Sequence, residues 1–248
     1  MPAVVMEAKG PVAVLRLNNG VTNAVGSEVL RDFERLLPEV REGFRGLVLA
    51  GNPKFFSIGL NLPELLALDR DGMTDIWRRC EDLVLQLYTL PLPTAAALAG
   101  HANGAGAILS LACDYRFVAE GRKLISLNEV AIGVPVPYLA DMLLRQIAGD
   151  RAAVGIEYES KLVPPEEARA LGLVDAVCTP EEVEATAIDK VTRLAAAPAR
   201  AFELTKRHRV REIPARFQAV RPELDRAFME CWFDSKTQGL LREAAKKF

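Results

Sequence analysis

Short apolar runs alternate with longer segments of helical periodicity in the first half of the chain. Four of the runs fit strands buried within a sheet, at residues 12–17, 46–51, 94–100 and 115–120. Between the first two, Ser27 suits an N-cap and Leu30, Phe33 and Leu37 form the apolar stripe of a helix. This alternation predicts an α/β fold in which helices cover a sheet.

The strand pattern fades after about Pro164. A helix is expected to begin at Pro164 or Pro165 and to stop at Gly172, followed by a short extended run. From Glu181 onward the pattern is nearly all helical, with large apolar residues at Phe202, Leu204, Phe217, Leu224, Phe228, Met229, Trp232 and Phe233. Such a tail must cover either its own core or a neighbouring subunit, and we expect burial against other subunits.

Charge and cysteine content narrow the class of protein. The 248 residues include 31 basic and 33 acidic side chains, with a formal charge of −2 and no basic block, so nucleic acid is not an expected partner. The four cysteines and two histidines lack the spacing of a disulfide framework or a zinc site. No segment reads as a signal peptide or membrane span, so we expect a cytoplasmic protein without a membrane partner.

Two glycine-containing turns follow strand candidates. The first is in GHANGAGAILSLACD (100–114), where a strand runs through glycines into an apolar helix at about 105–112. The second is SIGLN (57–61), which leads into a helix near Pro63. The glycines could simply permit close packing of helix and strand. Alternatively, two backbone N–H groups on separate turns could converge on one oxygen and form an oxyanion hole.

Four motifs in order carry a family resemblance: NPKFFSIGLNL, GHANGAGAILSLACDYRF, SLNEVAIGVP and EEARALGLVDAV. They resemble the enoyl-CoA hydratase/isomerase, or crotonase, superfamily over nearly the whole chain. The resemblance implies a crotonase-like spiral of ββα units, with an acyl-CoA-binding core at 1–180 and a C-terminal helical trimerisation region at 181–248. It also implies an acyl-CoA substrate, no metal or other cofactor, and a homotrimer or a dimer of trimers.

The resemblance also assigns roles to residues. The oxyanion donors are expected to be the backbone N–H groups of Leu60 and Ala105, and Glu129 is expected to be the catalytic acid–base. Substrate contacts are expected at Ser57, Gly59, Gly104, Leu62 and Pro135. The apolar neighbours of Glu129 favour a raised carboxyl pKa if the residue is buried, although a solvated surface glutamate is the common alternative.

The position that holds a first glutamate in the hydratases is Ile108. Hydration must activate water at C3 and deliver a proton to C2, which suits two positioned groups, whereas moving a double bond from C3 to C2 needs one proton shuttle. The sequence therefore predicts an enoyl-CoA isomerase, and it resembles the mitochondrial Δ3,Δ2 type more than the hydratases. The alternatives are an enoyl-CoA hydratase and a non-catalytic CoA-binding or scaffold protein.

Overall fold

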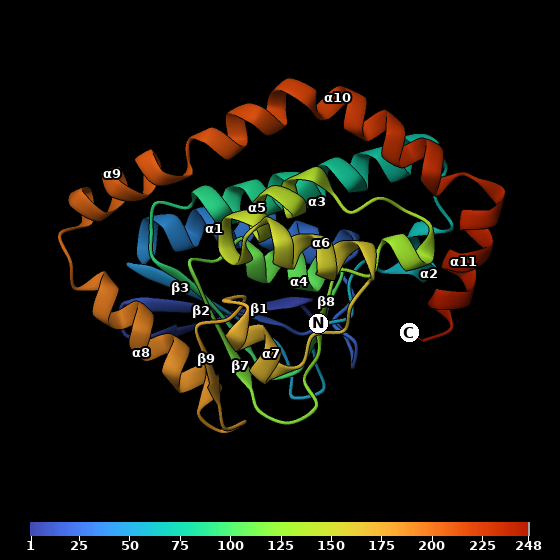
Figure 1. The fold of residues 1–248 in the computed structure, drawn as a ribbon. Helices are drawn as coiled ribbons and strands as arrows, with labels where there is room; N and C mark the ends of the chain where they lie inside the picture. The colour runs from blue at the N-terminus through green and yellow to red at the C-terminus, as the bar shows by residue number, and fades with distance from the viewer. Residues whose placement is uncertain (248) are drawn as a thin grey trace.

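The computed structural model describes residues 1–247, and a six-stranded sheet runs through its centre (Figure 1). The strand order is β1-β2-β3-β5-β7-β9, with β1 antiparallel to β2 and all other neighbours parallel. The strands are β1 (Val4–Lys9), β2 (Val12–Leu17), β3 (Gly46–Ala50), β5 (Thr94–Leu98), β7 (Tyr115–Ala119) and β9 (Ala176–Cys178).

Both faces of the central strands are buried, as expected for parallel strands between helical layers. One face, which includes Val14 and Val48, packs against α8 (Val183–Ala195). The opposite face, which includes Leu15 and Leu49, belongs to the larger core beneath the other helices. Helix α8 is therefore part of the core, although it lies within the region 181–248.

A second, three-stranded parallel sheet determines where the site forms. Its strands are β4 (Phe55–Ser57), β6 (His101–Asn103) and β8 (Ile125–Ser126), which follow β3, β5 and β7 along the chain. Because these strands are parallel, the three turns that leave their carboxyl ends lie at one edge of the sheet. The predicted turns at Gly59 and Gly104 and the Glu129 segment are these three turns.

The helices in the order of the chain are α1 (Ser27–Gly43), α2 (Leu62–Leu65), α3 (Arg70–Thr89), α4 (Ala105–Leu111), the 3₁₀ turn η1 (Val130–Ile132), α5 (Tyr138–Ala148), α6 (Asp150–Tyr158), α7 (Pro165–Ala170), α8, α9 (Ala199–Val210), α10 (Glu212–Trp232) and α11 (Ser235–Ala245). None of the helices within residues 1–247 is long and apolar enough to cross a membrane.

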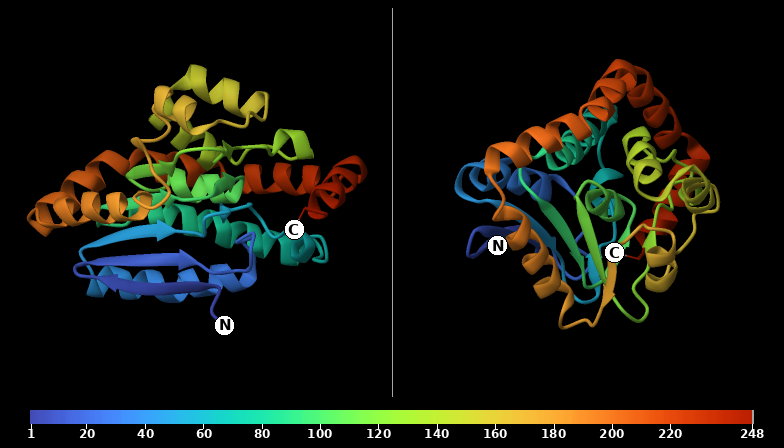
Figure 2. Two further views of the ribbon diagram at one scale, coloured as in Figure 1. Left: turned by 90° about the horizontal axis from the view of Figure 1, so that it is seen from below. Right: turned by 60° about the vertical axis from the view of Figure 1, so that its left-hand side comes forward.

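The C-terminal helices fold back over the same chain. Helix α10 lies along α3 and α5, and the right-hand view in Figure 2 shows the C-terminal segment along the outside of the helical layer. Phe217, Phe228 and Trp232 are buried there, and the Phe228 ring stacks on Trp77 of α3 with 3.5 Å between ring centroids. The expectation that these aromatic residues are buried against other subunits is therefore wrong, because their own core covers them.

The predicted α/β fold, its repeated ββα units and its helical tail are confirmed. All four predicted strands form, and α7 ends before Gly172, whose φ is +74°. The first strand, β1, was not predicted. The N-cap of α1 is Gly26 rather than Ser27, because the Glu64 side chain accepts a hydrogen bond from the Ser27 N–H at 3.0 Å and takes over the capping role.

Candidate active site

Two glycine turns meet at the edge of the small sheet. Gly59 and Gly104 have φ values of +113° and +48°, in the region that favours glycine over residues with a Cβ. The turns are so close that a Cβ added at Gly59 would lie 3.5 Å from the backbone nitrogen of Ala105. The two turns therefore converge, which is one of the two alternatives that the sequence leaves open.

Each turn offers a backbone N–H group next to its glycine. Among residues 1–247, no acceptor takes a hydrogen bond from the N–H of Leu60 or of Ala105. Ala105 is the first residue of α4, where helix N–H groups have no intrahelical partner. Both residues line the same cavity, so the pair has the composition and placement of an oxyanion hole.

Glu129 comes from the third turn and reaches the same point. A Cβ at Gly104 would lie 3.5 Å from its Oε1, and its Oε2 is buried without a hydrogen-bond partner among the described residues. The residue is only 8% exposed. Burial, with a smaller contribution from the negative charge of Glu157, raises the pKa of Glu129 to about 7. A carboxyl group with this pKa can both accept and return a proton near neutral pH.

A cavity of about 430 Å³ extends from these groups into the apolar core. Ile108 and Leu109 of α4 line it beyond Ala105, and Phe228 and Trp232 of α10 contribute to its wall. The C-terminal helices of the same chain thus complete the cavity. Its size and predominantly apolar lining suit a small hydrophobic group.

Glu81 of α3 is a second carboxyl group on the cavity wall. Its Oε2 accepts a hydrogen bond from Nε of Arg221, at 3.2 Å. Burial, and then the negative charge of Asp225, raises the pKa of Glu81 to about 8, so it holds its proton at neutral pH. Glu81 is therefore a poor base at neutral pH. Glu129 is the carboxyl group placed beside the free N–H groups.

Two residues predicted to contact substrate lie outside the cavity. Ser57 is fully buried beneath α4, where its hydroxyl donates to the Asn23 carbonyl and accepts from the Gly59 N–H. Ser57 thus shapes the turn. Pro135 is exposed, and Pro137 lines the cavity instead. The other predicted contacts, Gly59, Gly104 and Leu62, all line the cavity.

Several cavity residues were not identified from the sequence. Asn103 directly precedes Gly104 and Asn128 directly precedes Glu129, and Phe228 and Trp232 reach the cavity from the distant C-terminal helix α10. The aromatic residues of the tail were a signal of burial, but their sequence does not say which surface they cover. Ile108, which the resemblance aligns with the first glutamate of the hydratases, does line the cavity.

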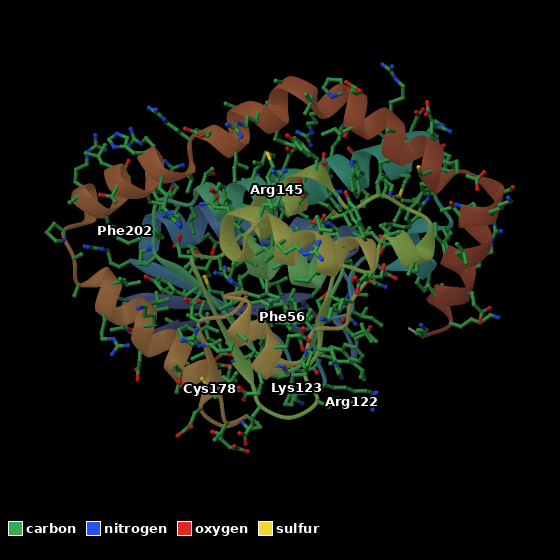
Figure 3. All side chains as sticks on the ribbon, in the orientation of Figure 1. Phe56, Arg122, Lys123, Arg145, Cys178 and Phe202 are labelled. Carbon is green, nitrogen blue, oxygen red and sulfur yellow. The ribbon has the colours of Figure 1, made fainter. Side chains whose placement is uncertain are left out.

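His101 lies on the cavity wall and has a defined hydrogen bond. Its Nδ1 accepts from the Leu124 N–H at 3.0 Å, so the neutral ring carries its hydrogen on Nε2. Burial, followed by the charges of Lys123 and Arg122, lowers the pKa of His101. Figure 3 labels these two basic residues on the loop after β7.

Among residues 1–247, no group of three His, Cys, Asp or Glu side chains is placed to hold a metal ion.

Comparisons with known proteins agree with this architecture. The sequence profile of the enoyl-CoA hydratase/isomerase family matches residues 7–246. Enoyl-CoA delta isomerase 1, mitochondrial, of Homo sapiens is 32% identical over 81% of this chain and 68% of its own length. A putative enoyl-CoA hydratase of Thermus thermophilus is 35% identical over 74% of this chain and 76% of its own length.

Comparison with a crystal structure shows that the fold is similar as well as the sequence. The human mitochondrial Δ3,Δ2-enoyl-CoA isomerase superposes with a TM-score of 0.94 and 29% identity, covering 99% of this chain and 97% of that one. The crotonase fold predicted from the four motifs is therefore confirmed. Together with the match over residues 7–246, this places the chain in the enoyl-CoA hydratase/isomerase family.

Proposed function

We propose that the chain is an acyl-CoA isomerase that moves a double bond of an enoyl thioester from C3 to C2. The observation that carries the proposal is one unpaired, buried carboxyl group, Glu129, beside the free N–H groups of Leu60 and Ala105. The similarity to the human isomerase supports the same reaction.

The proposed reaction needs one acid–base group. The Glu129 carboxylate removes a proton from C2, and negative charge develops on the thioester oxygen of the resulting dienolate. The Leu60 and Ala105 N–H groups stabilise that oxygen. The C3–C4 double bond becomes C2–C3 when protonated Glu129 returns the proton to C4. Gly59, Gly104 and Leu62 border the acyl group in this proposal, and no metal or other cofactor takes part.

The hydratase alternative rests on the same oxyanion donors. Ile108 argues against it, because an apolar side chain lines the cavity where hydratases have a second carboxylate. The deciding experiment incubates the protein with 3-enoyl-CoA and 2-enoyl-CoA in parallel. Conjugated 2-enoyl-CoA as the main product supports isomerisation, 3-hydroxyacyl-CoA supports hydration, and binding without turnover of either supports a non-catalytic CoA-binding or scaffold protein.

A homotrimer or a dimer of trimers remains part of the proposal. Several exposed apolar side chains lie on or near α6 and η1: Val130, Val154, Tyr158 and Leu162. The hydrogen bond from the Ala131 N–H to Oγ of Ser160 brings η1 close to the end of α6, and exposed apolar side chains in this region are suited to a subunit contact. Phe202, half-buried on α9 (Figure 3), is a second candidate contact. Sedimentation of wild type and Tyr158→Asp tests the proposed assembly.

The proposed compartment is the cytoplasm. The human relative is named as mitochondrial. Microscopy of the tagged, full chain in its own cells distinguishes the two locations.

A further inference from the structure

Helix α11 contacts the elements that follow two of the turns of the candidate active site. Helix α11 contacts α2, which directly follows the Leu60 turn, and η1, which directly follows Glu129. Its Leu241 is fully buried, and its Ala244 lines the cavity. The Asp234 carboxylate caps the helix by accepting from the N–H groups of Lys236 and Thr237. Helix α11 is therefore well anchored against the site.

One side chain of α11 binds the Glu129 turn directly. The Thr237 hydroxyl donates a hydrogen bond of 3.1 Å to the carbonyl oxygen of Gly133, and Thr237 is only 6% exposed. Gly133 has a φ of +87°, and a Cβ there would lie 2.7 Å from Oγ1 of Thr237 and 3.2 Å from its Cβ. The contact therefore depends on a glycine at 133 and fits closely around Thr237.

The Gly133 carbonyl is coupled to Glu129 by a short network of backbone hydrogen bonds. The N–H groups of Ile132 and Val134, on either side of Gly133, both donate to the Glu129 carbonyl at 3.1 Å. The N–H of Gly133 itself donates to the Val130 carbonyl at 3.1 Å. A group that holds Gly133 therefore also restrains the backbone that carries the Glu129 side chain.

We propose that Thr237 is a positioning residue, whose hydroxyl holds the Glu129 turn from the C-terminal helix of the same chain. The carboxyl group must face Gly104 and the free N–H of Ala105, and a small rotation of the turn would move it away. The catalytic consequence rests on the proposed isomerase function. The restraint that Thr237 places on the turn does not depend on that function. The restraint and the catalytic effect are therefore measured separately.

The test compares three variants with the wild type. Thr237→Val keeps the shape but loses the hydroxyl, and Thr237→Ser keeps the hydroxyl but loses the methyl group. Thr205→Val is the matched control, because Thr205 is an exposed helical threonine whose hydroxyl donates to the Ala201 carbonyl within α9. Hydrogen exchange is followed over residues 129–134, and kcat and KM are measured with 3-enoyl-CoA.

Thr237→Val is expected to speed amide exchange at 129–134 and to lower kcat roughly three- to tenfold, the effect of one lost hydrogen bond, with little change in KM. Thr237→Ser should restore values near the wild type, and Thr205→Val should change neither measurement. A residue that only stabilises the fold would change the unfolding temperature without altering kcat of the folded protein. Where Thr237→Val does not fold, Thr237→Ala, which also removes the hydroxyl, takes its place.

The inference is overturned if exchange at 129–134 or kcat is unchanged when the hydroxyl is lost. It is also overturned if Thr237→Ser is as impaired as Thr237→Val, because the hydroxyl would then not be responsible. Absence of 3-enoyl-CoA turnover in the wild type contradicts the proposed function instead, and the exchange measurement then decides whether Thr237 restrains the turn.

Discussion

Gly104 faces the carboxyl group of Glu129, since a Cβ on residue 104 would lie 3.5 Å from Oε1 of Glu129. The next residue, Ala105, carries a backbone N–H without an acceptor among residues 1–247. A buried carboxyl group and a free N–H group are therefore adjacent, and residue 104 between them has a φ of +48°, which favours glycine. The proposed isomerisation uses this arrangement, with Glu129 to remove a proton and the Ala105 N–H to stabilise the charge that results.

Replacement of Glu129 by glutamine tests the base directly. The amide keeps the shape but cannot accept the proton, so we expect Glu129→Gln to lower kcat by ~10²–10⁴-fold while acyl-CoA binding persists. Isomerase assays and binding of a saturated acyl-CoA measure the two effects. The control is Glu120→Gln, a change of an exposed carboxylate at the end of β7. A Glu129→Gln enzyme with a nearly unaltered rate would remove Glu129 from the mechanism.

The pH profile tests the raised pKa of Glu129. The base must be unprotonated, so kcat/KM should rise with pH through about 7 and level off above it. The nearby negative charge of Glu157 contributes to the raised pKa, and burial raises the pKa of Glu157 itself to about 7. Glu157→Gln removes that charge and should move the acidic limb to lower pH. Glu159→Gln, an exposed neighbour, should leave the profile in place. An acidic limb near the ordinary carboxyl range in the wild type would contradict the buried state of Glu129.

Stability should depend on pH for the same reason. The pKa of Glu129 is about 7 in the folded chain against an ordinary 4.5, so the folded state holds a proton that the unfolded state releases between these values. The free energy of unfolding should therefore fall as pH rises from 4.5 to 7, by about 3 kcal/mol for this group. Glu129→Gln should be more stable than wild type at pH 8, with the difference shrinking at pH 5. Denaturant unfolding at both values measures this, and equal stability of the two proteins at pH 8 would refute it.

Ile108 tests what separates isomerisation from hydration. The wild type should isomerise 3-enoyl-CoA much faster than it hydrates the product, because no second carboxylate serves the water. Ile108→Glu should raise the ratio of hydration to isomerisation on the order of tenfold, less than a fully positioned group provides. Ile108→Gln is the control with similar shape and no ionisable proton. Both products can be followed in one sample, and rapid hydration by the wild type without double-bond migration would contradict the isomerase proposal.

Local pattern was sufficient for much of the fold. Buried parallel strands such as β3 read as continuous apolar runs, and Gly172 marked the end of α7 through its backbone conformation. The glycines at 59 and 104 likewise marked a turn after each strand, and both have a positive φ. Strands, helix ends and turns depend on residues close together in the chain. Hydrophobic periodicity and turn-forming residues are therefore enough to predict them.

The sequence by itself thus determined the family, four strands of the large sheet, the helical tail and the three turns that carry Leu60, Ala105 and Glu129. Only the tertiary structure decided that the tail closes the cavity of its own chain, that Ser57 lies beneath α4, and that Glu157 and Thr237 lie near the Glu129 turn. The physical reason is that these relationships join residues far apart in the chain. An apolar stripe requires burial but does not specify the surface that buries it, and a hydroxyl or carboxyl group shows its role only when its spatial neighbours are known.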